Sequence, residues 1–244
     1  MILFYIRHGD PIYEPNQLTP LGERQAEAVA KRLAHYGVDK VFASTSNRAM
    51  QTAKPTCELM KLEMETLDWI NEFYAFKEMA IPVSEVKNRW VWAHPKYIAL
   101  MHSKEMRELG DLWYEHPSLK EFDLGRCQKR VGAEMDAWLQ TLGYRHDREK
   151  GLYEIISEDT DKRVALFAHE GVGKVFMSEI LDIPYPVYAS CFEFQHTGLT
   201  AIEFKMLPDG KYAFAHVLTL SNDSHLYREG LPLYNHNTTG RTKY

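Results

Sequence analysis

A chain of 244 residues with 45% hydrophobic and 26% charged residues has the composition of a folded globular protein, which excludes a disordered or fibrous chain. The formal net charge of −5 argues against a nucleic-acid partner and against an anionic membrane surface. The three cysteines form no CxxC pair and no apolar run is long enough to span a bilayer, so we expect a cytoplasmic protein with reduced thiols.

The first ten residues place charged groups at the end of a buried strand. Residues 2–6 form a continuous apolar run that is too short for a helix, which predicts a strand buried on both faces. Arg7, His8 and Gly9 follow directly. Ligands bind at the carboxyl ends of strands in open α/β sheets, and a half-buried cation favours an anion there. On these ten residues alone, an ordinary strand-to-loop exit is the better interpretation.

A helix and a second strand follow a short loop. Thr19-Pro20 is typical of a helix start, with a hydroxyl at the N-cap and proline at the first helical position. An apolar stripe runs along residues 26–33, and Gly37 is a plausible stop. Residues 38–43 form the next apolar run. A strand, a helix and a second strand within so few residues predict a βαβ unit with parallel strands.

The second strand leads into Ser44-Thr45-Ser46-Asn47-Arg48, at the start of another predicted helix. Helix N-termini present free backbone N–H groups and a partial positive charge, and both favour anions. Arg48 is placed against the sign of the helix dipole, which indicates a second use for its charge. A solvated first-turn arginine is the alternative.

Glu72 lies among aromatic and aliphatic residues, in the segment Trp69-Ile70-Asn71-Glu72-Phe73. A carboxyl group in apolar surroundings has a raised pKa and holds a proton near neutrality, as a general acid requires. We place Glu72 on a loop next to the sheet, where a solvated glutamate without a catalytic role is the competing interpretation.

The character of the chain changes between residues 82 and 142. Four of the five tryptophans fall here, with three histidines and many charges at helical spacing. We interpret a segment of about residues 77–150 as a helical insertion that folds over the sheet as a lid. Its histidines lack metal-ligand spacing, so we expect no metal site there.

A third buried strand, residues 164–168, ends in His169-Glu170-Gly171, and a helix is predicted over residues 172–181. This is the second strand that delivers a histidine at its carboxyl end. Residues 199–204 and 212–217 predict a hairpin that extends the sheet. The expected fold is a three-layer α/β/α domain over residues 1–244, with a mostly parallel central sheet and the helical lid.

Four segments together resemble the histidine phosphatase superfamily, whose members are also called phosphoglycerate mutase-like. They are RHG at residues 7–9, LTPLGERQA at 18–26, STSNRAMQTA at 44–53 and HEG at 169–171. The resemblance implies that His8 is the nucleophile that becomes phosphohistidine. It implies that Arg7, Arg48 and His169 form the phosphate pocket, and that Glu72 is the proton donor.

The sequence departs from the family pattern at several points. Glu170 replaces the glycine common after the second histidine and adds negative charge near the pocket, where we count it with the phosphate-binding residues. The loop after His8 lacks the usual ETxxN pattern, for which Asp10 and Asn16 partly substitute. Segments typical of the mutases are missing after Glu72 and after His169, which favours a phosphatase.

We therefore expect a phosphomonoester hydrolase that acts on a small phosphorylated metabolite and binds inorganic phosphate. No cofactor and no metal are expected, since arginines neutralise the phosphate. A phosphoglycerate-type mutase and a weakly active phospho-ligand-binding regulatory module remain alternatives. Glu170, Glu14 and Asp10 remain rivals of Glu72 as proton donor. The ester and the oligomeric state are left open by the sequence.

Overall fold

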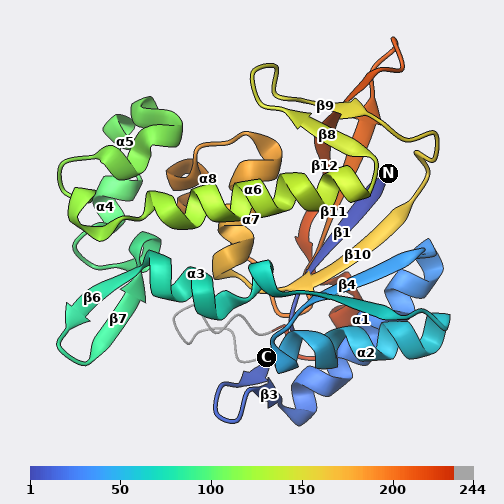
Figure 1. The fold of residues 1–244 in the computed structure, drawn as a ribbon. Coiled ribbons are helices and arrows are strands. Elements are labelled where there is room, and N and C mark those ends of the chain that lie inside the picture. Colours follow the sequence, from blue (N-terminus) through green and yellow to red (C-terminus); the bar gives the residue numbers. More distant parts are fainter. Residues whose placement is uncertain (234–244) are drawn as a thin grey trace.

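The computed structural model describes residues 1–233 and places helices on both sides of one large sheet (Figure 1). The strands are β1 (Ile2–Arg7), β2 (Pro11–Ile12), β3 (Gln17–Leu18), β4 (Lys40–Ser44), β5 (Met64–Leu67), β6 (Ala80–Ser84), β7 (Lys87–Trp90), β8 (Tyr144–Asp147), β9 (Leu152–Ile155), β10 (Arg163–Ala168), β11 (Leu199–Met206) and β12 (Tyr212–Asn222). The α-helices are α1 (Pro20–Tyr36), α2 (Asn47–Met60), α3 (Glu72–Met79), α4 (Ile98–Met101), α5 (Lys104–Leu109), α6 (Gly125–Thr141), α7 (Gly171–Leu181), α8 (Tyr185–Cys191) and α9 (Ser224–Arg228). Short 3₁₀ helices are η1 (Asp68–Ile70), η2 (Val91–Ala93), η3 (Gly110–Glu115) and η4 (Lys120–Phe122).

Within the described residues the main sheet has eight strands, in the order β5-β4-β10-β1-β11-β12-β9-β8. The pairings from β5 to β1 are parallel, and those from β1 to β8 are antiparallel. The α/β class and the central sheet flanked by helices are confirmed. The expectation of a mostly parallel sheet is wrong, because β11 enters beside β1 in the opposite direction. Short connections then make β11 with β12, and β8 with β9, antiparallel hairpins, and the pairing of β12 with β9 is antiparallel too.

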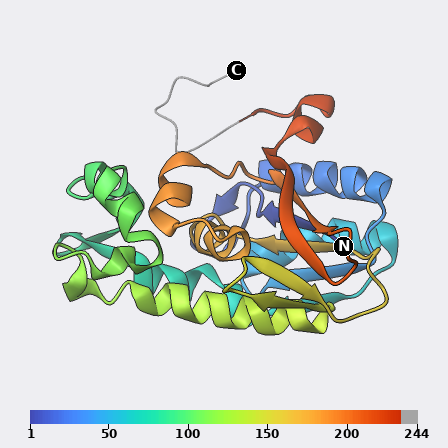
Figure 2. The same cartoon turned by 90° about the horizontal axis from the view of Figure 1, so that it is seen from above.

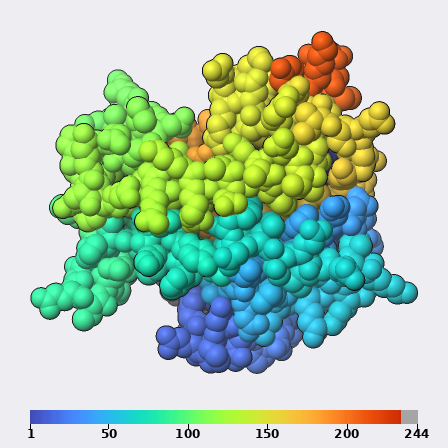
Figure 3. All heavy atoms as spheres, viewed as in Figure 1, coloured from blue at the N-terminus to red at the C-terminus, as the bar shows by residue number. Residues whose placement is uncertain are grey.

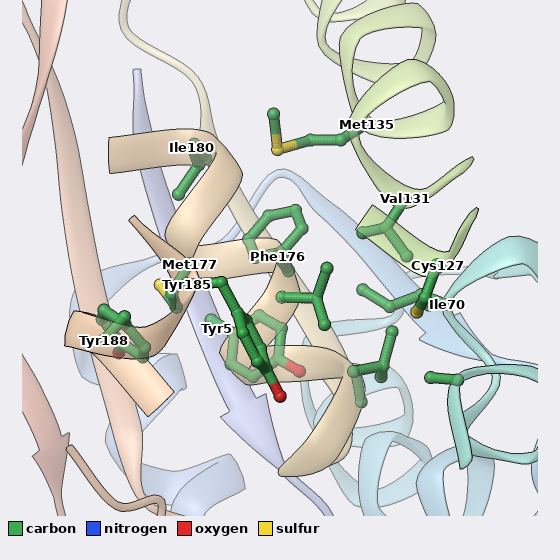
Figure 4. Close-up of a cluster of buried hydrophobic side chains, with 14 of the residues drawn as sticks. Tyr5, Ile70, Cys127, Val131, Met135, Phe176, Met177, Ile180, Tyr185 and Tyr188 are labelled. Atoms are coloured by element: carbon green, nitrogen blue, oxygen red, sulfur yellow. The ribbon is translucent and has the colours of Figure 1, made fainter. Parts of the chain in front are cut away.

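The alternation of side chains along β1 explains why both faces of the sheet are covered. Leu3 and Tyr5 belong to a cluster that includes α6 and α7, whereas Phe4 and Ile6 belong to a cluster with α1 and α2. A strand buried on both faces reads as a continuous apolar run, as this one does. Figure 2 shows α1 on one side of the sheet and α6 on the other, and Figure 4 shows Tyr5 near Phe176 of α7.

The predicted start and end of α1 are present. The Thr19 hydroxyl accepts a hydrogen bond from the Gly22 N–H at 3.0 Å, and Gly37 ends the helix with a φ of 72°. The first turn of α1 presses against the loop after β1, since a Cβ on Gly22 would lie 2.2 Å from the Asp10 carbonyl oxygen. Glycine at this position therefore lets the helix approach the backbone next to His8.

The segment from residue 77 to 150 contains more than helices. It begins at the end of α3, continues through the β6–β7 hairpin, α4, α5 and α6, and ends with β8 at the edge of the main sheet. Figure 3 shows the surface hollowed between this hairpin (teal) and the N-terminal residues (blue). In the described part of the chain, no helix has the length and apolarity to cross a membrane.

Candidate active site

The carboxyl ends of β1, β10 and β4 meet at one edge of the sheet. β1 and β10 are parallel with Arg7 opposite Ala168, so the residues that follow each strand lie side by side. The His8 and His169 ring centroids are 5.2 Å apart. Two histidines separated by about 160 residues in the sequence are thus brought together by strand register alone.

His8 is held in a single tautomer. Its Nδ1 lies 2.7 Å from the Gly9 carbonyl oxygen, which can only accept, so Nδ1 carries the proton and Nε2 has a free lone pair. Burial lowers the pKa of His8 well below 6.5, and the neighbouring His169, Arg7 and Arg48 lower it further. The ring is therefore neutral at pH 7, as a nitrogen nucleophile must be.

His169 is fully buried beside it. Its Nε2 lies 2.8 Å from the Ser44 hydroxyl at the end of β4. Burial, followed by the charges of Arg48 and Arg7, lowers the pKa of His169 well below 6.5. Its Nδ1 has no hydrogen-bond partner among residues 1–233. A buried polar atom of this kind is suited to a ligand that enters from the pocket.

Two buried guanidinium groups flank the histidines. Arg48, in the first turn of α2, donates from Nη1 to the Asn16 side-chain oxygen at 2.9 Å. Burial lowers the pKa of Arg48, because removing the guanidinium from water disfavours its charged form. Arg7 donates from Nη1 to the Phe194 carbonyl oxygen. Arginine binds phosphate oxygens in a planar, bidentate way, so this pair suits a phosphoryl group.

The sequence analysis placed Glu72 on a loop, but Glu72 is the first residue of α3. The preceding Asn71 caps the helix, because its side chain accepts from the Phe73 N–H at 3.0 Å. The Glu72 carboxylate accepts from the Gly171 and Val172 N–H groups of α7 at 2.9 and 2.8 Å. Burial raises the pKa of Glu72, and these hydrogen bonds and the arginines offset part of the rise.

The rival carboxylates have other surroundings than Glu72. Asp10 accepts from the Thr19 hydroxyl at 2.8 Å, and Glu14 is exposed. Glu170 lies 2.8 Å from Arg7 Nη1 and 3.7 Å from the buried Lys174 ammonium, so two cations compensate its charge. Of these three rivals, only Glu170 lines the same cavity as Glu72.

One cavity of about 850 Å³ joins these groups. At its inner end lie Arg7, His8, Asn16, Arg48, Glu72 and Glu170. Its outer end is lined by residues of α3, the β6–β7 hairpin, α4 and α8. The structure thus brings the predicted site residues to a single pocket, with His169 buried directly behind it, and the lid segment supplies the far wall.

The family model described as the histidine phosphatase superfamily (branch 1) matches residues 3–105. Over these residues the chain is similar to the histidine phosphatase superfamily. A curated relative, the probable phosphoglycerate mutase GpmB of Yersinia enterocolitica, is 32% identical over 73 residues. That match covers 26% of this chain and spans 34% of the relative's length.

Solved structures of the same fold cover most of the chain. A phosphoserine phosphatase of Entamoeba histolytica in complex with 3-phosphoglyceric acid has a TM-score of 0.57 at 17% identity, and covers 92% of this chain and 98% of its own. A mycobacterial glucosyl-3-phosphoglycerate phosphatase has a TM-score of 0.59 at 18% identity, with 91% and 98% covered. The α-ribazole phosphatase of Shigella flexneri has a TM-score of 0.55 at 17% identity, with 91% and 97% covered.

The fold also places groups at the site that the sequence did not single out. His196 is buried, its ring centroid is 5.7 Å from that of His8, and its Nδ1 lies 3.5 Å from an Asp10 carboxylate oxygen. His196 precedes β11, which runs antiparallel to β1, so the amino end of β11 meets the carboxyl end of β1. The sequence predicted the hairpin that contains β11 but not the pairing of β11 with β1, and without this pairing His196 could not be placed at the site.

Proposed function

We propose that this protein is a phosphomonoester hydrolase that acts through a phosphohistidine at His8 on a small phosphorylated metabolite. The observation that carries the proposal is the fixed tautomer of His8, whose Nε2 lone pair is available beside two buried arginines. The neighbouring folds named above are phosphatases of small phosphorylated molecules, and they support the same class of substrate.

The reaction has two steps. In the first, His8 Nε2 attacks phosphorus, the bond to the ester oxygen breaks, and Glu72 gives its proton to the departing alcohol. In the second, Glu72 takes a proton from water, the resulting hydroxide oxygen attacks the phosphohistidine, and phosphate leaves with His8 restored. General acid–base assistance of this kind contributes about 10²–10⁴-fold to the rate.

Arg7, Arg48 and His169 stabilise the phosphoryl oxygens in this mechanism. Phosphoryl transfer depends mainly on positioning and on neutralising charge, and the two guanidinium groups supply positive charge without deprotonating. Asn16 orients Arg48 through its 2.9 Å contact, and Glu170 shares Arg7 with the phosphate. We expect phosphate release to persist after dialysis against a chelator.

Trapping of the phosphoenzyme tests the role of His8. The wild-type protein is mixed with a radiolabelled phosphomonoester and quenched, and label is expected on the protein in an acid-labile, base-stable form. His8→Ala is expected to carry no label, whereas the matched control His35→Ala, at an exposed position on α1, labels like the wild type. Label that persists in His8→Ala would remove His8 from the mechanism.

A phosphoglycerate-type mutase is the second candidate, favoured by the name of the curated relative. A mutase would use the same residues but return the phosphoryl group to the substrate. Isomerisation of 3-phosphoglycerate is measured against phosphate release, with and without a bisphosphate primer. We expect phosphate release to dominate, and primer-dependent isomerisation in excess of hydrolysis would establish the mutase.

A weakly active binding module is favoured by one contact, the 2.8 Å approach of Glu170 to Arg7. Negative charge next to the phosphate site slows formation of the phosphoenzyme if phosphate cannot displace it. Tight binding of inorganic phosphate with negligible turnover of every ester tested would favour this candidate over the hydrolase.

A further inference from the structure

The outer half of the cavity has a wall of aromatic rings. Trp90 of β7 and Trp92 of η2 stack with their ring centroids 4.7 Å apart and an interplanar angle of 30°. Phe76 of α3 meets Trp90 edge-on, at 5.2 Å and 80°. Phe73 lines the same cavity. We refer to Phe73, Phe76, Trp90 and Trp92 as the aromatic wall.

The aromatic wall lies at the edge of the packing core, since Trp90 and Trp92 are only partly buried where they pack against it. Trp113 and Trp138, also in the segment from residue 77 to 150, are 0% and 5% exposed, whereas Phe73 and Phe76 are 68% and 39% exposed. Trp90 and Trp92 are partly exposed and face the cavity. Exposed apolar side chains that gather at one place mark a site where something binds.

Trp90 lies directly beside the proposed proton donor. A Cβ on Gly171 would lie 2.2 Å from Trp90 Cζ2, so the indole packs against the bare backbone at the start of α7. The same Gly171 donates its N–H to Glu72 at 2.9 Å. Because Glu72 protonates the leaving oxygen in the proposed mechanism, the atoms attached to that oxygen pass next to the Trp90 ring.

A buried cation holds Trp92 in place. The Lys174 ammonium lies 4.9 Å from the Trp92 ring centroid, and Lys174 itself is fully buried. It donates to the Ala189 carbonyl oxygen at 3.1 Å and lies 3.4 Å from Glu193. A cation over the indole face fixes the orientation of that ring. The wall is therefore ordered before a ligand arrives, which lowers the entropic cost of binding.

We propose that the preferred substrate is a phosphomonoester whose leaving group carries a planar aromatic ring, which the aromatic wall receives. This inference rests on the proposed hydrolase function and specifies its substrate class. A phosphate group fills only the inner end of a cavity of about 850 Å³. A small polyol phosphate would leave the rings in contact with water, whereas a planar ring would bury them and stack at 4.5–7 Å between centroids.

A series of primary alkyl phosphates tests the preference. Ethyl, 2-phenylethyl and 2-(1-naphthyl)ethyl phosphate have alcohol leaving groups of similar basicity, so differences in kcat/KM report contacts beyond the reacting centre. We expect the ring-bearing esters to exceed ethyl phosphate in kcat/KM by about 10- to 100-fold, mostly through KM. Equal kcat/KM values for all three esters would overturn the proposal.

Variants of Trp90 test whether the aromatic wall causes the preference for ring-bearing esters. Trp90→Ala is expected to bring the ratio of kcat/KM for 2-phenylethyl over ethyl phosphate to within about threefold of one, whereas Trp90→Phe retains most of it. The matched control is Tyr227→Ala, which removes an aromatic ring that is 80% exposed on α9 and is expected to keep the wild-type ratio. An unchanged ratio in Trp90→Ala would contradict the role of the wall.

Binding of phosphonates separates this inference from the hydrolase proposal. 2-Phenylethylphosphonate and ethylphosphonate cannot be hydrolysed, and calorimetry with the wild-type protein is expected to give an affinity about tenfold higher for the former. If the protein prefers 2-phenylethylphosphonate but hydrolyses no ester, the hydrolase proposal is overturned and the aromatic wall is still a binding site. Turnover without a preference would overturn the aromatic inference alone.

Discussion

Burial acts on His8 and Glu72 in opposite directions, and both directions suit the proposed chemistry. Removing water disfavours the charged form of each group, so the pKa of the imidazole falls and that of the carboxyl rises. The nucleophile is then neutral while the acid can still hold a proton. One dry pocket thus prepares both groups, although they come from different elements.

The pH profile of kcat/KM checks this pairing. Protonation of His8 removes the nucleophile, so activity is expected to fall only at a pH well below 6.5. Ionisation of Glu72 removes the acid, so activity falls as pH rises through its raised pKa. In Glu72→Gln this alkaline fall is expected to disappear, and kcat/KM for an alkyl phosphate to drop by about 10²–10⁴-fold.

The leaving group and a matched variant provide controls for Glu72. 4-Nitrophenyl phosphate needs no proton on its leaving oxygen, so Glu72→Gln is expected to lose much less activity with it. Glu27→Gln, at an exposed position on α1, is expected to keep the wild-type profile. Equal losses for the alkyl and the nitrophenyl ester would show that Glu72 is not the general acid.

Glu170 is expected to weaken phosphate binding. Its carboxylate lies 2.8 Å from Arg7 Nη1, so an incoming phosphate has to share that guanidinium with a fixed negative charge. Glu170→Gln removes the charge, and we expect the affinity for inorganic phosphate to rise roughly fivefold, which is about 1 kcal/mol. Competitive inhibition of ester hydrolysis by phosphate measures the change.

Glu179→Gln is the matched control for Glu170, because Glu179 of α7 is likewise a buried glutamate that pairs with an arginine, Arg148 at 2.7 Å. It is expected to leave phosphate affinity at the wild-type level. A fall in affinity in Glu170→Gln would instead mean that Glu170 is needed to hold Arg7 in place.

The sequence predicted the residues that end a strand or directly follow one, and it missed those that depend on distant packing. Arg7, His8 and His169 were identifiable because a buried strand can be read from an apolar run and its next residue then lies at the sheet edge. His196 and Lys174 follow no such rule. Their places at the site depend on the pairing of β11 with β1 and on the packing of Trp92 over α7.

Among the elements, helix starts were more predictable than the lid hairpin. Thr19 and Pro20 begin α1 as expected, since capping is a local interaction. The β6–β7 hairpin was not predicted, because it has no Asn-Gly or Asp-Gly turn and Pro82 argues against a strand. Pro82 pairs with Asn88 in a two-stranded ribbon, where each strand is an edge and a missing N–H is tolerated.

The contact between α1 and the loop after β1 gives a test at the level of one element. Alanine is normally favoured over glycine in a helix by about 1 kcal/mol. At Gly22 we expect the opposite, because the new Cβ would lie 2.2 Å from the Asp10 carbonyl oxygen and push the loop away. Gly22→Ala is expected to lower the free energy of unfolding by about 1–3 kcal/mol.

Activity and a neighbouring variant show where the Gly22 effect acts. Displacement of the loop moves His8, so kcat is expected to fall about tenfold or more along with stability. Arg24→Ala, at an exposed position in the same helical turn, is expected to change neither kcat nor the urea midpoint measurably. A more stable and fully active Gly22→Ala would contradict the close approach.

At the scale of the whole molecule, one apolar cluster runs from the sheet into the lid segment. Leu3 and Val164 of the sheet belong to the same buried cluster as Met106, Trp113 and Leu119 of the lid segment. β8 also joins the edge of the main sheet. A segment that shares its core with the sheet has little apolar surface of its own to bury separately. We therefore expect residues 1–233 to unfold as a single cooperative domain.

Urea unfolding of two core variants tests this cooperativity. Leu119 in the lid segment and Ile202 in β11 are both fully buried, so each change to alanine is expected to cost about 2–5 kcal/mol. Tryptophan fluorescence reports the lid, which holds four of the five tryptophans, and far-UV circular dichroism reports the whole chain. In a single unit both variants lower the midpoint of both signals together, with an unchanged slope.

If Leu119→Ala moved the fluorescence transition and left most of the circular dichroism transition in place, the lid would be a separate folding unit. The aromatic wall could then open without unfolding the phosphate site.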